Sequence, residues 1–337
     1  MKLRTPLLAG TAVLVVALLI GVTTGPAGLT PSAVLRDLID ALPGVSVDSG
    51  LTVPQQAVLW EIRLPRVVLG AMVGASLALA GAAYQGVFRN PLADPYLLGV
   101  SSGAGLGATL ALVAGGSLGP FPVSLLAFAG GMAGVVATYA LGSSVGGGRS
   151  AVVIILAGVA VAAFANAAQT YVQQRYDDSL RSVYTWLLGR LSTDGWSDVV
   201  AVLPLVVIAA LVIVLHRRIL DVLAVGEVEA ATLGVTPERT RLILVVAATL
   251  GTAAVVSVSG LIGFVGILIP HLVRLIFGVS YRVLVPVSAV LGAAFLVLTD
   301  VLARTVIAPA ELPIGVVTAM VGAPFFLVVL RRARTVA

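Results

Sequence analysis

The chain has 337 residues, of which 59% are hydrophobic and only 10% are charged. Because soluble domains carry about 25% charged residues, this composition excludes an ordinary soluble enzyme. A membrane-spanning helix needs about 20 apolar residues, so the apolar content suffices for about ten spans. The sequence contains no cysteine, which excludes disulfides, thiolate metal sites, iron–sulfur clusters and a cysteine nucleophile.

Ten apolar runs, separated by glycine, proline and charged clusters, are predicted to be helices. They lie near residues 6–23, 66–88, 93–114, 121–143, 151–173, 197–216, 239–258, 262–278, 283–303 and 313–330. The first run follows Lys2 and Arg4 and resembles a secretory signal, but Thr23, Thr24 and Gly25 follow it in place of a cleavage site. We therefore expect an uncleaved first span in an all-α, polytopic membrane protein with one domain, residues 1–337.

The net charge of +5 is better explained by membrane topology than by a nucleic-acid partner. With the N-terminus in the cytoplasm, thirteen of the 20 Lys and Arg residues fall on the inner side, which predicts that both termini are cytoplasmic. Two longer segments, 25–61 and 173–197, then lie outside. In the second, the stretch 180–191 is expected to form a short interfacial helix, with Trp186 and Trp196 at the level of the lipid headgroups.

Two segments suggest an inverted repeat. AGAAYQGVFRNP, which ends at Pro91, and SGLIGFVGILIP, which ends at Pro270, each have a glycine ten residues before the final proline. The first follows a span that runs inward and the second a span that runs outward, as in many transporters. Gly99, Gly103 and Gly107 stand four residues apart, which predicts close helix packing.

No catalytic motif is supported by its context. Gly99, Ser101 and Gly103 match the G-x-S-x-G pattern of serine hydrolases but lie in an apolar, glycine-rich run. The phosphate-binding loop and the HExxH zinc motif are absent. We therefore expect no catalytic residue, no metal and no cofactor in this chain, and any ATP that drives it would be bound by another chain.

The spans contain few ionisable residues, which disfavours an ion-coupled secondary transporter. Their polar side chains are instead uncharged, and this set suits a bulky cargo that slides through without tight binding. The set is Tyr84, Gln85, Asn166, Gln169 and Thr170. A secondary transporter driven by an ion gradient is the alternative of another class, and a membrane-embedded enzyme is a third.

The inner segment 217–238 contains GEVEAATLGV, from Gly226 to Val235. This stretch is too short to span a membrane and too apolar for a free loop, so it predicts docking against a partner, with a plain connecting turn as the alternative. The side chains available for such contacts are Leu223, Val228, Ala231 and Leu233, rimmed by Glu227 and Glu229.

Five segments together resemble the signatures of FecCD family permeases. They are RLPR at 63–66, FRNPLADPYLLGVSSGAGLGA at 88–108, GEVEAATLGV, GFVGILIPHLVRL at 263–275 and ELPIGVVTAMVGAPF at 311–325. FecCD permeases belong to ATP-binding-cassette (ABC) importers for ferric siderophores, haem and cobalamin. The resemblance covers nearly the whole chain and implies the inverted-repeat type II importer fold, with ten helices in a bacterial cell membrane.

The resemblance also implies the partners and the cargo. Two ATPase subunits would bind ATP and Mg²⁺ on the inside, and a substrate-binding protein would dock on the outside. A second permease would complete the pathway, in a homodimer or in a heterodimer with a related permease. An iron–siderophore complex is the expected cargo, with haem and cobalamin as alternatives.

Residue roles follow from the resemblance as well. Arg63, Arg66 and Arg304 match arginines that accept acidic residues of the binding protein, with snorkelling to the interface as the alternative. Asn90 and Leu92 match positions that help to close the cytoplasmic gate. The second gate turn reads 146–150 here and departs from the Ser/Thr-rich pattern of relatives. The coupling helix that fits the ATPase would use Gly226, Glu227, Glu229, Ala230, Leu233 and Gly234.

Overall fold

The computed structural model describes residues 3–25, 28–115, 123–144, 151–192 and 195–334, and these parts are helical, without strands. Ten helices correspond to the predicted apolar runs: α1 (Arg4–Thr23), α4 (Leu64–Val87), α5 (Val100–Ala114), α6 (Val123–Ser144), α7 (Ala151–Arg175), α9 (Ser197–Leu215), α12 (Pro237–Ser259), α13 (Val265–Phe277), α14 (Tyr281–Thr305) and α15 (Ile314–Arg334). Within the described residues, seven helical segments are long and apolar enough to cross a membrane, and α5, α13 and the Ile314–Leu327 part of α15 are shorter apolar stretches. The predicted all-α membrane fold is confirmed.

The third membrane helix, α5, begins seven residues later than the apolar run predicts. Residues Pro95–Leu98 instead form a short 3-10 turn, η2, which Asp94 caps by accepting a hydrogen bond from the Tyr96 backbone N–H at 2.7 Å. Gly99 then adopts a left-handed conformation with φ of +82°. Glycine tolerates this conformation because it has no Cβ, and the turn it makes separates η2 from α5.

Helix α4 is the centre of the molecule. It packs against α9, α12, α13 and α14. In the continuous helical segment Val53–Val87, which contains α4, 78% of the most apolar stretch is buried, compared with 28% for α1. Glycines permit this approach: a Cβ on Gly74 would lie 2.1 Å from the carbonyl oxygen of Gly292, and one on Gly81 would lie 1.8 Å from that of Gly266. Any larger residue there would force the helices apart.

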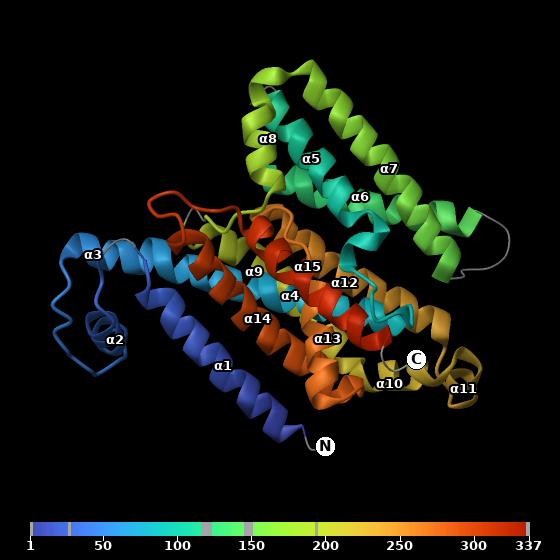
Figure 1. Ribbon diagram of the computed structural model, residues 1–337, viewed down its shortest axis with the longest axis horizontal. Coiled ribbons are helices and arrows are strands. Elements are labelled where there is room, and N and C mark those ends of the chain that lie inside the picture. Colours follow the sequence, from blue (N-terminus) through green and yellow to red (C-terminus); the bar gives the residue numbers. More distant parts are fainter. Residues whose placement is uncertain (1–2, 26–27, 116–122, 145–150, 193–194, 335–337) are drawn as a thin grey trace.

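Helices α5, α6 and α7 form a second group, which packs onto the rest mainly through α12 (Figure 1). A Cβ on Gly103 would lie 2.2 Å from the carbonyl oxygen of Gly130, and one on Gly107 would lie 2.1 Å from that of Leu126. The predicted close packing at the glycine spacing is therefore confirmed.

The segments between the spans add short helices. After α1 come α2 (Pro31–Asp40), α3 (Val53–Ala57) and the π-helical turn η1 (Val58–Arg63), and after α7 come the 3-10 turn η3 (Asp177–Ser179) and α8 (Leu180–Leu187). The expected interfacial helix is thus present but ends four residues early. Of its two tryptophans, Trp186 is buried with 6% exposed, whereas Trp196 is 37% exposed. Trp186 packs against α5, α6 and α12 and is therefore a core residue that does not contact headgroups, while its depth at the level of the headgroups stays a prediction.

Asp37 fixes α2 to the start of the second span. Its carboxylate accepts hydrogen bonds from Trp60 Nε1 at 2.8 Å and from Gln56 Nε2 at 2.9 Å. Burial raises the pKa of Asp37, but these hydrogen bonds and one with Ser49 outweigh it and hold the pKa below the usual value. The loop after α1 is therefore tied to the bundle by a charged anchor.

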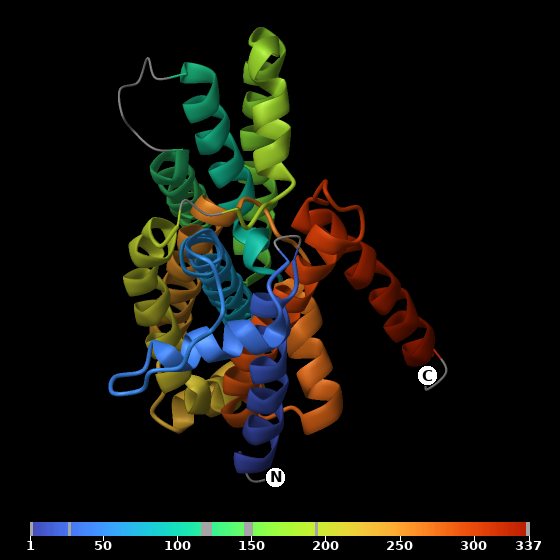
Figure 2. The same cartoon turned by 90° about the vertical axis from the view of Figure 1, so that its left-hand side faces the viewer.

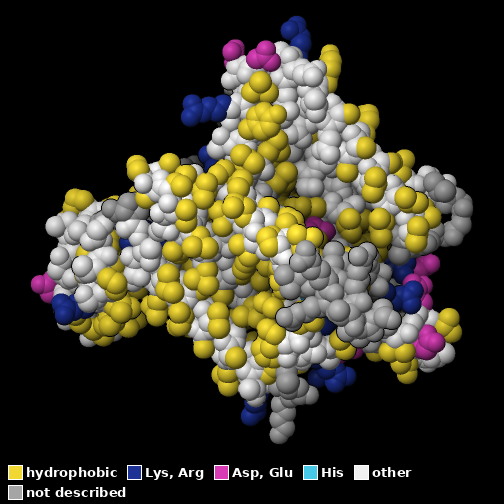
Figure 3. All heavy atoms as spheres, viewed as in Figure 1, with side chains coloured by type: hydrophobic (Ala, Val, Ile, Leu, Met, Phe, Trp, Pro, Cys, Tyr) yellow, Lys and Arg dark blue, Asp and Glu magenta, His cyan; other side chains and the backbone are white. Residues whose placement is uncertain are grey.

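We call the end of the bundle where α1 begins and α4 ends the inner end, and the opposite end the outer end. The short helices α10 (Arg217–Val225) and α11 (Glu227–Thr232) lie at the inner end. Helix α15 stands away from the bundle in the turned view (Figure 2). Hydrophobic side chains cover much of the face seen in Figure 3, and most of the charged side chains lie at its edges, as expected for a surface in contact with lipid.

Candidate functional site

A charged cluster at the outer end joins α4 to α14. The Arg66 guanidinium donates to Asp300 Oδ1 from Nε at 3.0 Å and from Nη2 at 2.8 Å. It also donates to Glu311 from Nη1 at 2.9 Å and from Nη2 at 2.8 Å. The hydrogen bond from Arg66 lowers the pKa of the Glu311 carboxyl more than burial raises it. Both edges of this guanidinium are therefore occupied within the chain.

The other two predicted docking arginines, Arg63 and Arg304, are buried, with 4% and 5% exposed. Arg63 donates to the carbonyl oxygen of Val22 at 3.1 Å, and Arg304 donates to that of Gly21. Their positive charges therefore lie at the C-terminal end of α1, where a helix favours cations. Arg304 also approaches Asp300, with Nε 3.3 Å from Oδ2.

The structure thus brings the three arginines together around the outer ends of three helices, with two carboxylates that the sequence did not assign to them. Asp300 and Glu311 are 234 and 245 residues from Arg66 along the chain. No local spacing signals such pairs. Of the three arginines, only Arg66 reaches the surface, with 14% of its side chain exposed. Docking of a binding protein at this cluster stays a prediction.

The predicted coupling segment consists of α10 and α11, joined at Gly226. Within α11, Ala230 is fully buried, whereas Val228 is 74% exposed and Leu233, just after the helix, is 70% exposed. Gly234 follows with φ of +79° and open space around its Cα. The segment therefore holds itself to the bundle on one side and presents apolar side chains on the other.

Glu227 links this segment to two other elements of the inner end. Its Oε1 accepts a hydrogen bond from Arg241 Nη2 on α12, and the same oxygen lies 3.7 Å from Arg89 Nη2. Arg89 lies two residues after the end of α4 and precedes the predicted gate residues Asn90 and Leu92. Through one carboxylate, α11 is thus connected both to α12 and to the turn between α4 and α5. Glu229 is exposed, as is Glu227, whose side chain is 45% exposed.

The turn between α4 and α5 is built by local hydrogen bonds. Asn90 Oδ1 accepts from the Leu92 N–H at 2.9 Å, and Leu92 is 52% exposed. Arg89 has a positive φ of 50°, uncommon for a residue with a Cβ. Burial raises the pKa of the Asp94 carboxyl to about 6, against the effect of its hydrogen bond from Tyr96. The second predicted gate turn, 146–150, lies outside the described residues.

The uncharged polar residues of the spans divide into two sets. Tyr84 and Gln85 are each 1% exposed: the Tyr84 hydroxyl lies 2.8 Å from Thr249 Oγ1, and Gln85 Nε2 donates to Gly266 at 3.2 Å. They hold helices together, so the expectation that they line a path is wrong for Tyr84, whereas Gln85 also borders a cavity at the inner end. On α7, by contrast, Asn166 and Thr170 are exposed, while Gln169 is buried with 7% exposed. Among the described residues, no group of three or more His, Asp or Glu side chains is placed to hold a metal ion.

Comparisons with known proteins match almost the whole chain. A model of the FecCD transport family matches residues 13–332. The cobalamin import system permease protein BtuC of Halobacterium salinarum is 45% identical over 282 residues, which cover 84% of this chain and 75% of that protein. The Fe(3+) dicitrate transport system permease protein FecD of Escherichia coli is 40% identical over 277 residues, 82% of this chain and 86% of its own. A solved structure of a metal-chelate type ABC transporter in an inward-facing conformation superposes with a TM-score of 0.81 at 29% identity, over 97% of this chain and 98% of that one.

Proposed function

This chain belongs to the FecCD transport family and is an ABC importer permease, and we propose that it moves an iron–siderophore complex across the membrane into the cytoplasm. The observation that carries the proposal is the likeness over almost the full length to a metal-chelate type transporter, together with 40% identity to an iron dicitrate permease. Such a chelate is bulky, and a pathway lined by uncharged polar and apolar side chains suits it better than a charged site does.

Cobalamin is the second candidate, because the cobalamin permease is 45% identical to this chain. Haem is the third cargo class of the family. All three are large metal complexes, so the same pathway chemistry serves each of them, and the choice among them would rest largely with the substrate-binding protein.

An ATPase subunit is the proposed partner of α10 and α11. The exposed Val228 and Leu233 offer apolar contacts, and the exposed Glu229 supplies a polar rim. Because the chain has no phosphate-binding loop, ATP and Mg²⁺ would be held by that subunit. This chain would then be a transport subunit without catalysis of its own.

The Glu227 contacts give a physical route from this docking surface to the pathway. A displacement of α11 by the ATPase would pull on Arg241 of α12 and on Arg89 beside the gate turn, since both guanidinium groups share one carboxylate. Asn90 and Leu92 would move with Arg89. The gate would thus open or close with the nucleotide state of the partner.

A second copy of the permease would complete the pathway. On α7, Phe164 is 75% exposed and Tyr171 is 71% exposed, and on α15 Met320 is 69% exposed. Helix α15 stands apart from its own bundle (Figure 2), so a second copy would replace lipid as the neighbour of its apolar side chains. We favour a homodimer in a bacterial cell membrane, with both termini in the cytoplasm and the binding protein at the outer end.

Uptake by cells that lack this chain, and by the same cells after it is restored, tests the proposal. Iron-labelled siderophores, labelled haem and cobalt-labelled cobalamin are offered in parallel, with and without depletion of ATP. Uptake of the siderophore that requires both the chain and ATP is the expected result. Uptake of cobalamin alone would identify cobalamin as the cargo in place of the siderophore complex. Uptake that collapses with the ion gradient but survives loss of ATP would refute the ABC mechanism.

A further inference from the structure

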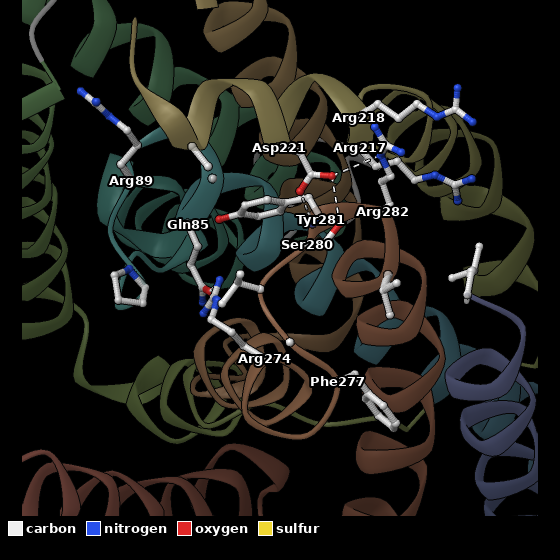
Figure 4. A pocket seen from close by; sticks show the side chains of 17 residues that line it. Gln85, Arg89, Arg217, Arg218, Asp221, Arg274, Phe277, Ser280, Tyr281 and Arg282 are labelled. Carbon is white, nitrogen blue, oxygen red and sulfur yellow. Dashed lines mark hydrogen bonds and ion pairs between the residues drawn. The ribbon is translucent and has the colours of Figure 1, made fainter. Parts of the chain in front are cut away.

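A large basic cavity lies at the inner end, where α1 begins, α4 and α13 end, and α14 begins. Its volume is about 1110 Å³, and α10 forms one side of it. Of the residues that the structure describes, five arginines and a single acidic residue, Asp221, line this basic cavity (Figure 4). The arginines are Arg89, Arg217, Arg218, Arg274 and Arg282.

Asp221 already accepts hydrogen bonds within the chain, and its single negative charge does not balance the charges of the five arginines. Asp221 accepts hydrogen bonds from the Tyr281 N–H at 2.6 Å and from Ser280 Oγ at 3.0 Å. Its one arginine partner is Arg282, with Nε at 3.5 Å. Within the described parts of the chain, Arg217 and Arg218 form no ion pair. The cavity therefore carries excess positive charge.

Arg274 is held in the wall with a free donor. Gln85 fixes it: Arg274 Nη2 donates to Gln85 Oε1 at 3.0 Å, and Gln85 Nε2 donates in turn to the carbonyl oxygen of Gly266. The other terminal nitrogen, Nη1, is buried and has no hydrogen-bond partner among the described residues. A buried donor on a charged group is costly without an acceptor, so the Arg274 charge adds to the positive potential of the cavity wall without being neutralised by a carboxylate.

Apolar side chains adjoin the arginines. Leu3, Phe277 and Val279 line the cavity beside the charges, and just outside it Leu275 and Ile276 at the end of α13 are 63% and 58% exposed. Since four membrane helices begin or end here, the cavity lies at the depth where lipid headgroups meet acyl chains.

We propose that the basic cavity binds the phosphate headgroup of an anionic phospholipid from the inner leaflet, with its acyl chains along the exposed end of α13. Guanidinium groups match phosphate oxygens in charge and geometry. Basic pockets between membrane helices on the cytoplasmic side bind such headgroups in general. The adjoining apolar surface favours a lipid over a soluble phosphate, because a soluble anion would leave that surface unused.

Titration of the purified full-length chain in detergent, followed by native mass spectrometry, tests the proposal. The probes are dioleoylphosphatidylglycerol, dioleoylphosphatidylcholine, glycerol 3-phosphate and inorganic phosphate. The phosphatidylglycerol is expected to bind at least tenfold more tightly than the phosphatidylcholine. Each basic residue near an anionic lipid strengthens binding about fivefold, so Arg217→Gln with Arg218→Gln should weaken phosphatidylglycerol binding about 30-fold.

The matched control removes two exposed arginines from the opposite side of the fold, Arg175→Gln with Arg181→Gln, and should leave lipid affinity unchanged. Arg218→Gln alone, at an exposed position, should weaken binding about fivefold and serves if the double variant does not fold. Equal lipid affinity in wild type and double variant would overturn the proposal. So would phosphate or glycerol 3-phosphate displacing the lipid at equal concentration, or a double variant that loses only its affinity for the ATPase subunit. None of these readouts depends on transport.

Discussion

The substitution Arg66→Gln separates a structural role of the outer cluster from a docking role. Glutamine removes the charge that Asp300 faces, and the Asp300 side chain is only 4% exposed. Breaking a buried ion pair from one side costs about 3–5 kcal/mol, because the remaining charge stays buried. The approach of Arg304 Nε, 3.3 Å from Asp300, places the expected loss at the lower end, about 3 kcal/mol. The lost contact with Glu311, 49% exposed, adds about 1 kcal/mol or less.

Thermal unfolding of the purified chain in detergent measures this loss. At about 1.4 °C per kcal/mol for a chain of 337 residues, a loss of about 3–4 kcal/mol in Arg66→Gln should lower Tm by about 4–6 °C. Arg190→Gln is the matched control. Arg190 lines a cavity at the outer end together with Arg66 and Asp300, but it is exposed, and the Tm of this variant should change by less than about 2 °C. If Arg66→Gln has the same Tm as the wild type and the control variant, the reasoning is refuted. Unchanged stability together with lost affinity for the binding protein would instead establish docking at Arg66.

Three further predictions concern the other sites. Glu227→Gln weakens the charged hydrogen bond with Arg241 and should lower the ratio of cargo transported to ATP hydrolysed at least fivefold in proteoliposomes; an unchanged ratio would disconnect α11 from the gate. Gly234→Ala places a Cβ at φ of +79°, which costs about 1–2 kcal/mol, so coupling or complex assembly should fall measurably, and wild-type values in both assays would count against the coupling role. The pKa of Glu311 is lowered by Arg66, so its pair stabilises the fold above the ordinary Glu pKa and is lost as pH falls through the lowered value; the Tm difference between wild type and Glu311→Gln should shrink below about pH 4, and a difference that grows there would contradict the assigned direction.

The sequence by itself determined the fold class and nearly all the membrane helices. Apolar runs of span length report directly on burial in lipid, and the glycine spacing of α5 reports on close packing, because both signals are local. The boundary error at α5 has a local cause as well. Asp94, Pro95 and Gly99 form a capped turn whose apolar neighbours continue the hydrophobic run without continuing the helix.

The tertiary structure alone decided what the charged and polar side chains do. Arg66 meets Asp300 and Glu311 only because α4 crosses α14 over 200 residues later in the chain, and Glu227 meets Arg89 only because α11 folds back beneath α4. A composition that is 59% hydrophobic identifies which segments enter the membrane. It does not record which of the few charges face one another, since that depends on helix crossings that the apolar pattern leaves undetermined.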